Sequence, residues 1–349
     1  MEKGINQRKT EHIRLCLTGD VEGVNKTTGL EGIDFIHNAL PEINFRDIDI
    51  RTEFLGKQLK APFLVSSMTG GSELATVINQ NLAQAAEKKG WVMALGSTRA
   101  MLESDAHQES FLINDYAPTV PLIVNLGAVQ LNYGYGAEEA QRIVDLTNAD
   151  SIVLHFNSLQ EVVQDEGDLN FDNLLPKIEA VCKGVNVPVG AKEVGFGIDG
   201  TVAKKLYDAG ISYIDVAGAG GTSWSQVEKL RSRDPLRRAA AEAFNSWGIP
   251  TKDCIVSVRN TLPNVPVVSS GGMKTGLDAA KAMTIGADII GFARHLLKAA
   301  TESTEKVIET MEQIELELRM TMFGIGAKNL TELKNTNRVR INGKSLLDQ

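Results

Sequence analysis

The sequence predicts an α/β protein with a (β/α)8 barrel, in which eight parallel strands close into a ring and alternate with helices. A short apolar run that ends in small residues recurs eight times along the chain. The runs start at intervals of 30, 30, 29, 37, 25, 53 and 23 residues. A barrel of about 250 residues uses roughly 30 residues per strand–helix unit. Near-continuous apolar runs are also typical of strands that helices cover.

In chain order, the predicted strands are 62–68, 92–97, 122–127, 151–156, 188–194, 213–218, 266–272 and 289–294. Between the first two strands, apolar residues recur at helical spacing, and weaker versions of this pattern follow later strands. The same units could also build an open, doubly wound parallel sheet, which is the alternative architecture.

Three further segments surround these units. The 53-residue interval follows the sixth strand, and residues 222–250 are charged and helix-prone, which predicts an insertion that acts as a mobile lid on the catalytic face. Residues 1–61 form an N-terminal extension. Residues 302–322 predict a helix with one apolar stripe, inside a C-terminal helical segment over 301–349. No Pro-, Gly- or Ser-rich linker separates these parts, so we expect residues 1–349 to form a single domain.

The composition is that of a globular protein. The 349 residues include 36 Lys+Arg and 44 Asp+Glu, for a net charge of −8, which argues against a general nucleic-acid binder. Cys16, Cys182 and Cys254 lie far apart without a CxxC pair, as expected in a reducing compartment. The N-terminus is polar, and no apolar run approaches the ~18 residues of a membrane span. We therefore expect a soluble, cytoplasmic protein with no nucleic-acid or membrane partner.

Polar residues recur where each predicted strand ends. In a barrel, the C-terminal ends of the strands carry the active site, so this recurrence predicts an enzyme. In chain order, these ends hold Ser67 to Gly71, Gly96 to Arg99, Asn125 to Gly127, His155 to Asn157, Lys192 to Gly195, Gly218 to Thr222, Ser269 to Gly272 and Gly291 to Arg294.

The last two strand ends predict a phosphate site. Gly271 and Gly272 allow backbone N–H groups to approach an anion, and Arg294 can close on the same phosphate. The alternative is that these glycines only form tight turns. Lys192 interrupts an apolar strand, so we expect it to face the barrel mouth, where it meets an anion or a Schiff-base partner. Its alternative is an ion pair with an acid on a neighbouring strand.

Two other patterns have more than one interpretation. Residues 195–200 form a literal GxGxxG with Asp215 20 residues beyond its first glycine, which matches the dinucleotide-binding fingerprint. This motif follows the fifth strand, however, whereas the fingerprint normally opens its fold. Arg8, Lys9 and His12 form a basic group that either binds substrate phosphates or is a solvated tail.

His155 and Glu161 are candidates for acid, base or metal ligand, and a structural histidine is the alternative for His155. Glu161 is a hard oxygen donor, which Mg²⁺ accepts together with substrate phosphates. No stronger metal-ligand spacing is present in the sequence.

Eight short sequence motifs, in the same order along the chain, resemble the type 2 isopentenyl-diphosphate isomerase family, whose members are flavin-dependent (β/α)8 enzymes. The resemblance covers residues 8–294 through RKTEH (8–12), MTGG (68–71), GSTR (96–99), NLGA (125–128), HFNSLQE (155–161), KEVGFG (192–197), GAGGTSW (218–224) and SSGG (269–272). The lysine strand and the late glycine turns also occur in other FMN barrels. The chain departs from the family at Met273-Lys274, where arginine is frequent.

The resemblance implies FMN, Mg²⁺ and NADPH as cofactors. FMN would be bound by Ser67, Met68, Thr69, Gly70, Ser97, Asn125, Lys192, Thr222, Gly271, Gly272, Ala293 and Arg294. The substrate diphosphate would be bound by Arg8, Lys9, Ser97, Thr98, Arg99, His155, Asn157 and Gln160. Glu161 would bind Mg²⁺, and the catalytic residues would be Gln160, His155 and Lys192.

The implied reaction interconverts isopentenyl and dimethylallyl diphosphate, with reduced FMN as acid and base. Gln160 has no accessible pKa, so positioning or a proton relay is its expected role. The resemblance also implies a homo-oligomer, a tetramer or an octamer. Another FMN-dependent oxidoreductase, of the nucleotide or 2-hydroxy-acid type, is one alternative, although the cysteines lie away from strand ends and His295 lies outside any matching phrase. A non-catalytic flavin or phosphate sensor is the other.

Overall fold

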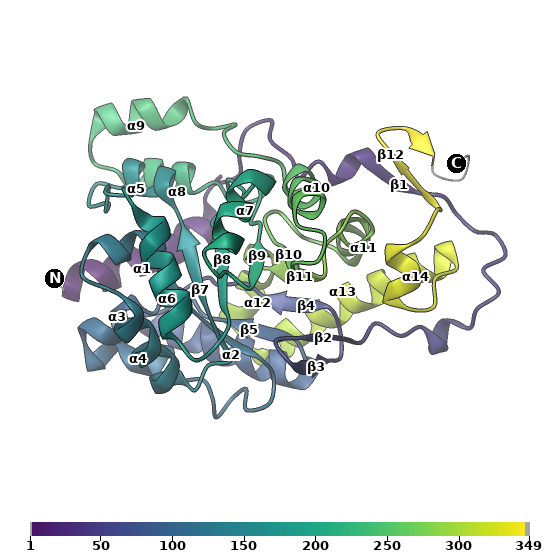
Figure 1. Cartoon of the computed structure of the whole chain (residues 1–349), viewed down its shortest axis with the longest axis horizontal. Helices are drawn as coiled ribbons and strands as arrows, with labels where there is room; N and C mark the ends of the chain where they lie inside the picture. Colours follow the sequence, from purple (N-terminus) through teal and green to yellow (C-terminus); the bar gives the residue numbers. More distant parts are fainter. Residues whose placement is uncertain (1, 346–349) are drawn as a thin grey trace.

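The computed structural model describes residues 2–345, with side chains described for residues 8–104 and 108–344. Eight parallel strands form a closed barrel surrounded by helices (Figure 1), which confirms the predicted (β/α)8 architecture. The barrel strands are β4 (Phe63–Val65), β5 (Val92–Ala94), β6 (Leu122–Gly127), β7 (Ser151–Phe156), β8 (Val189–Glu193), β9 (Tyr213–Asp215), β10 (Val267–Ser269) and β11 (Ile289–Phe292).

The ring closes where the last strand pairs with the first. β11 runs parallel to β4, with Ile290 opposite Phe63, so the open-sheet alternative is wrong. Every predicted strand is present, and six of them are shorter than predicted. The small and polar residues at the C-terminal ends of the predicted strands are not part of the strand pairing. They form turns at the mouth of the barrel.

Helices cover the outside of the barrel between these strands. They are α2 (Glu73–Lys89), α3 (Arg99–Glu103), α4 (Ala137–Thr147), α5 (Ser158–Val163), α6 (Leu174–Gly184), α7 (Gly200–Asp208), α10 (Thr251–Thr261), α11 (Gly276–Thr284) and α12 (Arg294–Glu302). Their apolar faces and the outward side chains of the strands form the main hydrophobic core.

A short hairpin closes the N-terminal end of the barrel. β2 (Thr52–Phe54) and β3 (Lys57–Leu59) place Phe54 and Leu59 in a second buried cluster with the inward side chains of the strands. The ring centroid of Phe54 lies 5.3 Å from that of Tyr213 in an edge-to-face contact. This end is therefore filled, and any site must lie at the opposite end.

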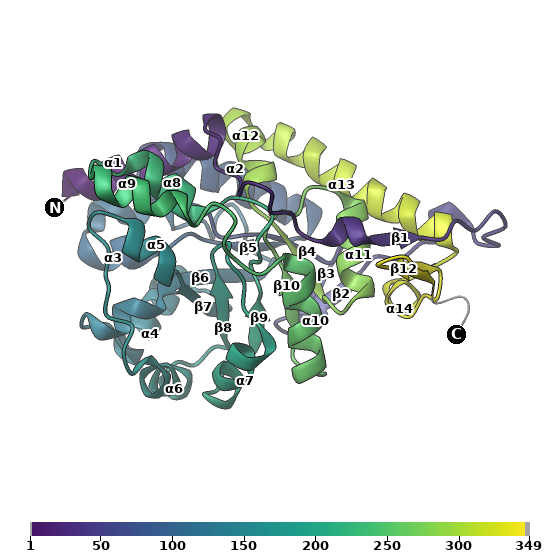
Figure 2. The ribbon, with the colours of Figure 1, turned by 90° about the horizontal axis from the view of Figure 1, so that it is seen from above.

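The C-terminal ends of the strands are covered by three helices. α1 (Glu2–Thr18) packs against α8 (Trp224–Arg231), and α9 (Pro235–Glu242) packs against α8 in turn. Figure 2 shows all three on one side of the barrel strands. The last two helices lie between β9 and α10, within residues 222–250 that follow the sixth barrel strand.

The C-terminal region packs against the outside of the barrel. α13 (Thr304–Ile325) confirms the predicted helix over 302–322, with the predicted stripe buried. α14 (Leu330–Lys334) follows, and β12 (Val339–Ile341) pairs with β1 (Ile33–Phe35) and with β13 (Lys344–Ser345). Within residues 2–345, no helix has the length and apolar character needed to cross a bilayer.

Candidate active site

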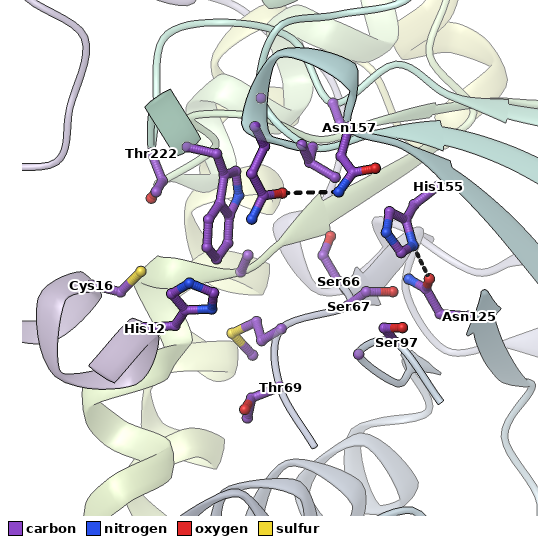
Figure 3. A pocket seen from close by; sticks show the side chains of 18 of the residues that line it. His12, Cys16, Ser66, Ser67, Thr69, Ser97, Asn125, His155, Asn157 and Thr222 are labelled. Atoms are coloured by element: carbon purple, nitrogen blue, oxygen red, sulfur yellow. Dashed lines mark hydrogen bonds between the residues drawn. The ribbon is translucent and has the colours of Figure 1, made fainter. Parts of the chain in front are cut away.

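A cavity of about 480 Å³ lies under α1 and α8 at the C-terminal ends of the barrel strands (Figure 3). Its volume falls in the range of ~300–1,000 Å³ that is typical of sites for small molecules and cofactors. Most of the predicted site residues line it, namely Arg8, Lys9, Ser67, Met68, Thr69, Ser97, Arg99, Asn125, His155, Asn157, Gln160, Glu161, Lys192, Thr222, Gly271, Gly272, Ala293 and Arg294. The strand ends therefore converge as the sequence predicts.

Two of the predicted site residues lie outside this lining. The hydroxyl of Thr98 is buried and donates to the carbonyl oxygen of Asn125 at 2.7 Å, so it holds two strand ends together. Gly70 packs against Phe111, and a Cβ at this position would lie 2.0 Å from Cε1 of that ring. Its lack of a side chain thus has a packing reason.

His155 is held as a neutral hydrogen-bond donor. Its Nδ1 lies 2.6 Å from Oδ1 of Asn125, so Nδ1 carries the proton and Nε2 is left as an acceptor. Burial, together with the positive charges of Lys192, Lys9 and Arg99, lowers the pKa of His155 to about 3. At neutral pH this imidazole is therefore uncharged and is a poor acid.

Three cations meet in the cavity lining. Arg8 and Lys9 come from α1, and Arg99 begins α3 after β5. Burial and the charges of Arg8 and Arg99 lower the pKa of Lys9 to about 7. Nε of Arg8 is buried and has no hydrogen-bond partner in the described part of the chain. An anion bound here would relieve this repulsion and accept that hydrogen bond.

A carboxylate and an amide oxygen lie next to these cations. Glu161 Oε1 accepts from Nδ2 of Asn157 at 2.7 Å, and its Oε2 accepts from the backbone N–H of Asp168 at 2.8 Å. Burial raises the pKa of Glu161 above its usual value, although these two hydrogen bonds act to lower it. Oδ1 of Asn157 is buried and finds no partner within the described residues. These oxygens are of the hard type that Mg²⁺ prefers.

The described residues contain no cluster of three or more His, Cys, Asp or Glu that could hold a metal ion alone. Mg²⁺ needs only one or two protein carboxylates when phosphate oxygens complete its shell. The donor set around Glu161 therefore fits Mg²⁺ together with a diphosphate, and does not fit a site built from the protein alone.

Gln160 is held by a network that the sequence analysis missed. Its Nε2 donates to Glu228 Oε1 at 3.0 Å, and His12 Nε2 lies 2.9 Å from the same oxygen. Arg231 donates to the other oxygen of this carboxylate. Hydrogen bonds and positive charge lower the pKa of Glu228 despite its burial, so it is ionised at neutral pH.

Glu228 lies on the inserted helix α8, and Gln160 and His12 are 68 and 216 residues away from it in the sequence. Its only sequence signal was its place in the charged insertion after the sixth strand. His12 belonged to the basic group predicted at the N-terminus, and its ring also contacts that of Trp224 edge-on at 5.1 Å. The solvated-tail alternative for this group is therefore wrong.

The glycine-rich loop at 195–200 already binds an anion from its own chain. Oε2 of Glu193 accepts from the backbone N–H groups of residues 194 to 197, at 2.6, 2.7, 2.5 and 3.2 Å. These amides are the donors that a dinucleotide pyrophosphate would need. The dinucleotide-binding interpretation of this loop is therefore wrong, and Glu193 is the residue that stabilises its turn.

A second set of residues in the cavity lining fits a flavin and its phosphate. The buried hydroxyls of Ser66, Ser67 and Thr69, which follow β4, have no hydrogen-bond partners in the part of the chain that is described. Gly271 has φ +95°, and a Cβ there would lie 2.1 Å from the carbonyl oxygen of Gly218. Only glycine allows the turns after β9 and β10 to lie this close and to present their amides.

Arg294 belongs to this second set, and its guanidinium is engaged. Its Nε donates to the carbonyl oxygen of Cys16 at 2.8 Å, and its Nη1 donates to Glu22 at 2.9 Å. Lys274 donates to the same carboxylate at 3.3 Å. Lys274, at a position where arginine is frequent in the family, thus binds the same carboxylate as Arg294. A phosphate bound here would compete with Glu22 for both cations.

The fold and this cavity define a flavin-type barrel, and comparison with known families agrees. The family described as FMN-dependent dehydrogenase matches residues 2–118 and 141–340. A protein of Oceanobacillus iheyensis named isopentenyl-diphosphate delta-isomerase is 79% identical over 349 residues, which is the full length of both chains. Proteins with the same name from Nostoc sp. and Rickettsia canadensis are 48% and 49% identical, over 94% of this chain and 94% and 95% of theirs.

Solved structures show the same fold at low sequence identity. A lactate oxidase of Pediococcus acidilactici has a TM-score of 0.66 and 17% identity, with 96% of this chain and 93% of that chain covered. A mutant flavocytochrome b2 with pyruvate bound has a TM-score of 0.68 and 18% identity, with 94% and 82% covered. The likeness to these two is one of fold alone. The chain belongs to the FMN-dependent dehydrogenase family, among its members named isopentenyl-diphosphate delta-isomerase.

Proposed function

We propose that this protein interconverts isopentenyl diphosphate and dimethylallyl diphosphate with FMN as its cofactor. The observation that carries this proposal is that one cavity is lined by two sets of anion-binding groups and by a buried polar network. The glycine turns and Arg294 suit the phosphate of FMN, and the cations around Lys9 suit a diphosphate. The names of the full-length relatives agree with this assignment.

FMN would be held by the hydroxyls after β4, by Ser97 and Asn125, and by the turns that carry Thr222, Gly271, Gly272, Ala293 and Arg294. Lys192 would face its isoalloxazine and stabilise negative charge on the reduced ring. When bound and reduced, FMN supplies the proton that the terminal alkene carbon accepts and takes up the proton that leaves C2. NADPH is the proposed reductant.

The diphosphate would be bound by Arg8, Lys9 and Arg99 through charge-assisted hydrogen bonds. In the structure Arg99 donates to Asp168 and Gln130, at 3.2 and 2.8 Å. Arg99 would therefore have to give up part of these hydrogen bonds to bind the diphosphate. Glu161 would hold the Mg²⁺ that neutralises the diphosphate, with His155 and Asn157 as neutral donors and acceptors nearby.

Within the same cavity, Gln160 would position the isoprenoid chain. Its amide is fixed by Glu228 and by Asn157, whose Nδ2 lies 3.3 Å from Oε1 of Gln160. An amide cannot exchange protons as an acid or base at neutral pH, so orientation is the role that its chemistry allows. α1 and α8 would exclude water, which protects a strongly acidic proton donor from the solvent.

The proposal is tested by the visible spectrum of the purified protein and by anaerobic product analysis. We expect a flavin spectrum and conversion of isopentenyl to dimethylallyl diphosphate with no net oxidation once the flavin is reduced. Oxidation of a 2-hydroxy acid would instead indicate the oxidoreductase alternative, in which His295, which also lines the cavity, is the candidate base. Binding of FMN or diphosphate without any product would indicate a sensor.

We expect Gln160→Asn to lower kcat by about 10- to 100-fold, since a shorter amide loses its bond to Glu228 and misplaces the substrate. FMN content and the KM for isopentenyl diphosphate should change little, because the cations around Lys9 are untouched. Steady-state kinetics and flavin absorbance measure both quantities. Unchanged turnover would remove Gln160 from the reaction.

We expect the KM for isopentenyl diphosphate to rise with pH above about 7, where Lys9 loses its proton in the free protein. Below this pH Lys9 is an ammonium that attracts the diphosphate, and each pH unit above it costs up to about tenfold in affinity. Lys9→Arg is the matched control, because arginine stays charged and should flatten this profile. Titration of the substrate itself affects both proteins equally. An identical pH profile in Lys9→Arg would contradict the assignment.

We also propose that residues 1–349 act as one barrel domain in a cytoplasmic homo-oligomer, a tetramer or an octamer, without nucleic-acid or membrane partners. The three free cysteines, at positions 16, 182 and 254, support a reducing compartment. We further propose that the insertion over 222–250 opens as a lid to admit substrate. Light scattering with and without isopentenyl diphosphate measures the oligomeric state.

A further inference from the structure

Glu193 is a buried carboxylate that lies outside the cavity lining, next to a residue that belongs to it. Lys192 lines the cavity, whereas Glu193 does not. Both residues are buried, with exposed fractions of 7% and 8%. Successive residues of a strand point to opposite faces, so these two side chains leave the end of β8 in opposite directions. Any effect of Glu193 on a bound cofactor therefore passes through its neighbours.

The side chain of Glu193 holds the turn that follows it in the chain. Its Oε2 accepts from the backbone N–H groups of residues 194 to 197, at distances from 2.5 to 3.2 Å. Burial raises the pKa of Glu193, and these N–H groups and the charge of Lys192 act to lower it. Val194 and Gly195 of this turn line the cavity. The carboxylate thus fixes part of the cavity wall from outside.

The peptide group between Glu193 and Val194 has both of its polar atoms engaged. Its N–H donates to Oε2 of Glu193 at 2.6 Å, and its carbonyl oxygen accepts from Nζ of Lys192, also at 2.6 Å. A trans peptide is planar, with N–H and C=O pointing in opposite directions. The carboxylate that fixes the direction of this N–H therefore also fixes the carbonyl oxygen that holds Lys192.

These contacts form a chain of hydrogen bonds that runs from the carboxylate of Glu193, through one peptide group, to Nζ of Lys192. Hydrogen bonds in such a chain polarise one another, so the bound carboxylate makes the carbonyl oxygen a stronger acceptor. Lysine has a flexible stem and three donors on one nitrogen. An acceptor of fixed direction therefore decides where the remaining donors of Lys192 point.

We propose that Glu193 is a positioning residue that acts through Lys192: by orienting the peptide group between residues 193 and 194, it directs the side-chain nitrogen of Lys192 at the flavin ring. The inference rests on the FMN-dependent function proposed above. Without the carboxylate, Lys192 would stay in the cavity but lose its fixed direction. The loss of binding should be larger for reduced FMN, because the reduced ring carries the negative charge that Lys192 would stabilise.

The test measures the midpoint potential of FMN in the loaded protein, which reports the preference for reduced over oxidised FMN. Glu193→Gln keeps the size of the side chain but replaces the charged acceptor with a neutral amide. We expect this preference to fall by about 3- to 30-fold, within the range of coupling in one hydrogen-bond network. For a two-electron couple, this is a fall of the potential by about 14 to 44 mV.

The sign of the change separates positioning from a direct effect of charge. Loss of a negative charge near the ring would by itself favour the reduced, negatively charged flavin and raise the potential. Loss of the turn alone would weaken the binding of both redox states equally and leave the potential unchanged. A raised or an unchanged potential in Glu193→Gln would therefore overturn the proposal.

A second background tests whether the effect passes through Lys192. In a Lys192→Met protein, Glu193→Gln should no longer lower the potential, and a fall of the same size as in the wild-type background would overturn the proposal. Asp199→Asn is the matched control, because the carboxylate of Asp199 also accepts from a backbone N–H, that of Val202 at 2.8 Å, and lies outside the cavity lining. This control should leave the potential unchanged, and a similar fall would also overturn the proposal.

Two other backbone hydrogen bonds hold the turn, so we expect Glu193→Gln to fold. The carbonyl oxygen of Phe196 accepts from the N–H of Ile249 at 2.8 Å, and the N–H of Ile198 donates to the carbonyl oxygen of Val216 at 3.1 Å. If the variant does not fold, Glu193→Asp provides the same test, because its shorter side chain keeps the charge but does not reach the same N–H groups. A fall of the potential is again expected, and an unchanged potential would overturn the proposal.

The same measurements separate this inference from the proposed function. A protein that binds FMN and isomerises isopentenyl diphosphate, but keeps its potential when Glu193 is replaced, would refute only the role of Glu193. A protein that binds no FMN would refute the proposed function, and with it this inference.

Discussion

Gly271→Ala is expected to destabilise the protein by about 2 to 5 kcal/mol and to weaken FMN binding by more than about 100-fold. The new Cβ would lie 2.1 Å from the carbonyl oxygen of Gly218, in a backbone conformation with φ +95°. Both the left-handed conformation and the overlap are unfavourable, and the overlap involves backbone atoms that no side-chain rotation can move away. The turn must therefore open, and with it the amides proposed to bind the phosphate.

Chemical denaturation and FMN titration of the apoprotein measure the two effects. Gly56→Ala is the matched control, because Gly56 also has a positive φ, +73°, but open space around its Cβ position. It should cost only about 1 to 2 kcal/mol and leave FMN binding unchanged. Equal effects of the two substitutions would mean that backbone conformation, and not the close approach to Gly218, determines the result.

Lys192→Ala is expected to weaken FMN binding by about 10- to 150-fold, which corresponds to the ~1.5–3 kcal/mol of a hydrogen bond to a charged group. The loss should be larger for reduced FMN than for oxidised FMN, because reduction places negative charge on the ring that the ammonium would stabilise. Turnover of isopentenyl diphosphate should fall in parallel.

Fluorescence titration with FMN in both redox states measures these affinities. Lys57→Ala is the control, since Lys57 pairs with Asp150 at the filled end of the barrel, far from the cavity lining. A Lys192→Ala protein with full flavin content and wild-type activity would contradict the proposed contact between Lys192 and the cofactor.

The strand ends were the most predictable part of the candidate site. Residues such as Ser67, Asn125 and Lys192 lie directly after or within apolar runs, and a closed parallel barrel brings all such ends to one mouth. Their positions therefore follow from local patterns once the fold is known. Thr98 and Gly70 lie outside the cavity lining, where Thr98 bonds to a neighbouring strand end and Gly70 packs against Phe111. Their placement therefore depended on packing that the pattern does not show.

Some roles that the sequence analysis missed depend on contacts between residues that are distant in the chain, and others on local contacts. Glu228 belongs to the site only because the insertion folds back onto α1 and α5, where it meets His12 and Gln160. Glu193 ends the strand before the predicted dinucleotide loop, and its own side chain satisfies the amides of that loop. Asp215 was noted only as the acid of that motif, and its register opposite Lys192 gives it a different neighbour.

The eightfold recurrence of apolar runs was sufficient by itself to predict eight strand–helix units and their approximate positions, because the burial of strands between helices imposes a repeating pattern along the chain. The choice between a closed barrel and an open sheet depended on the pairing of β11 with β4. Tertiary structure alone decided which cations share a cavity, which protons His155 and Lys9 hold, and which acid faces Lys192. Such properties depend on distance and burial, and closure of the ring sets both between residues that are remote in the sequence.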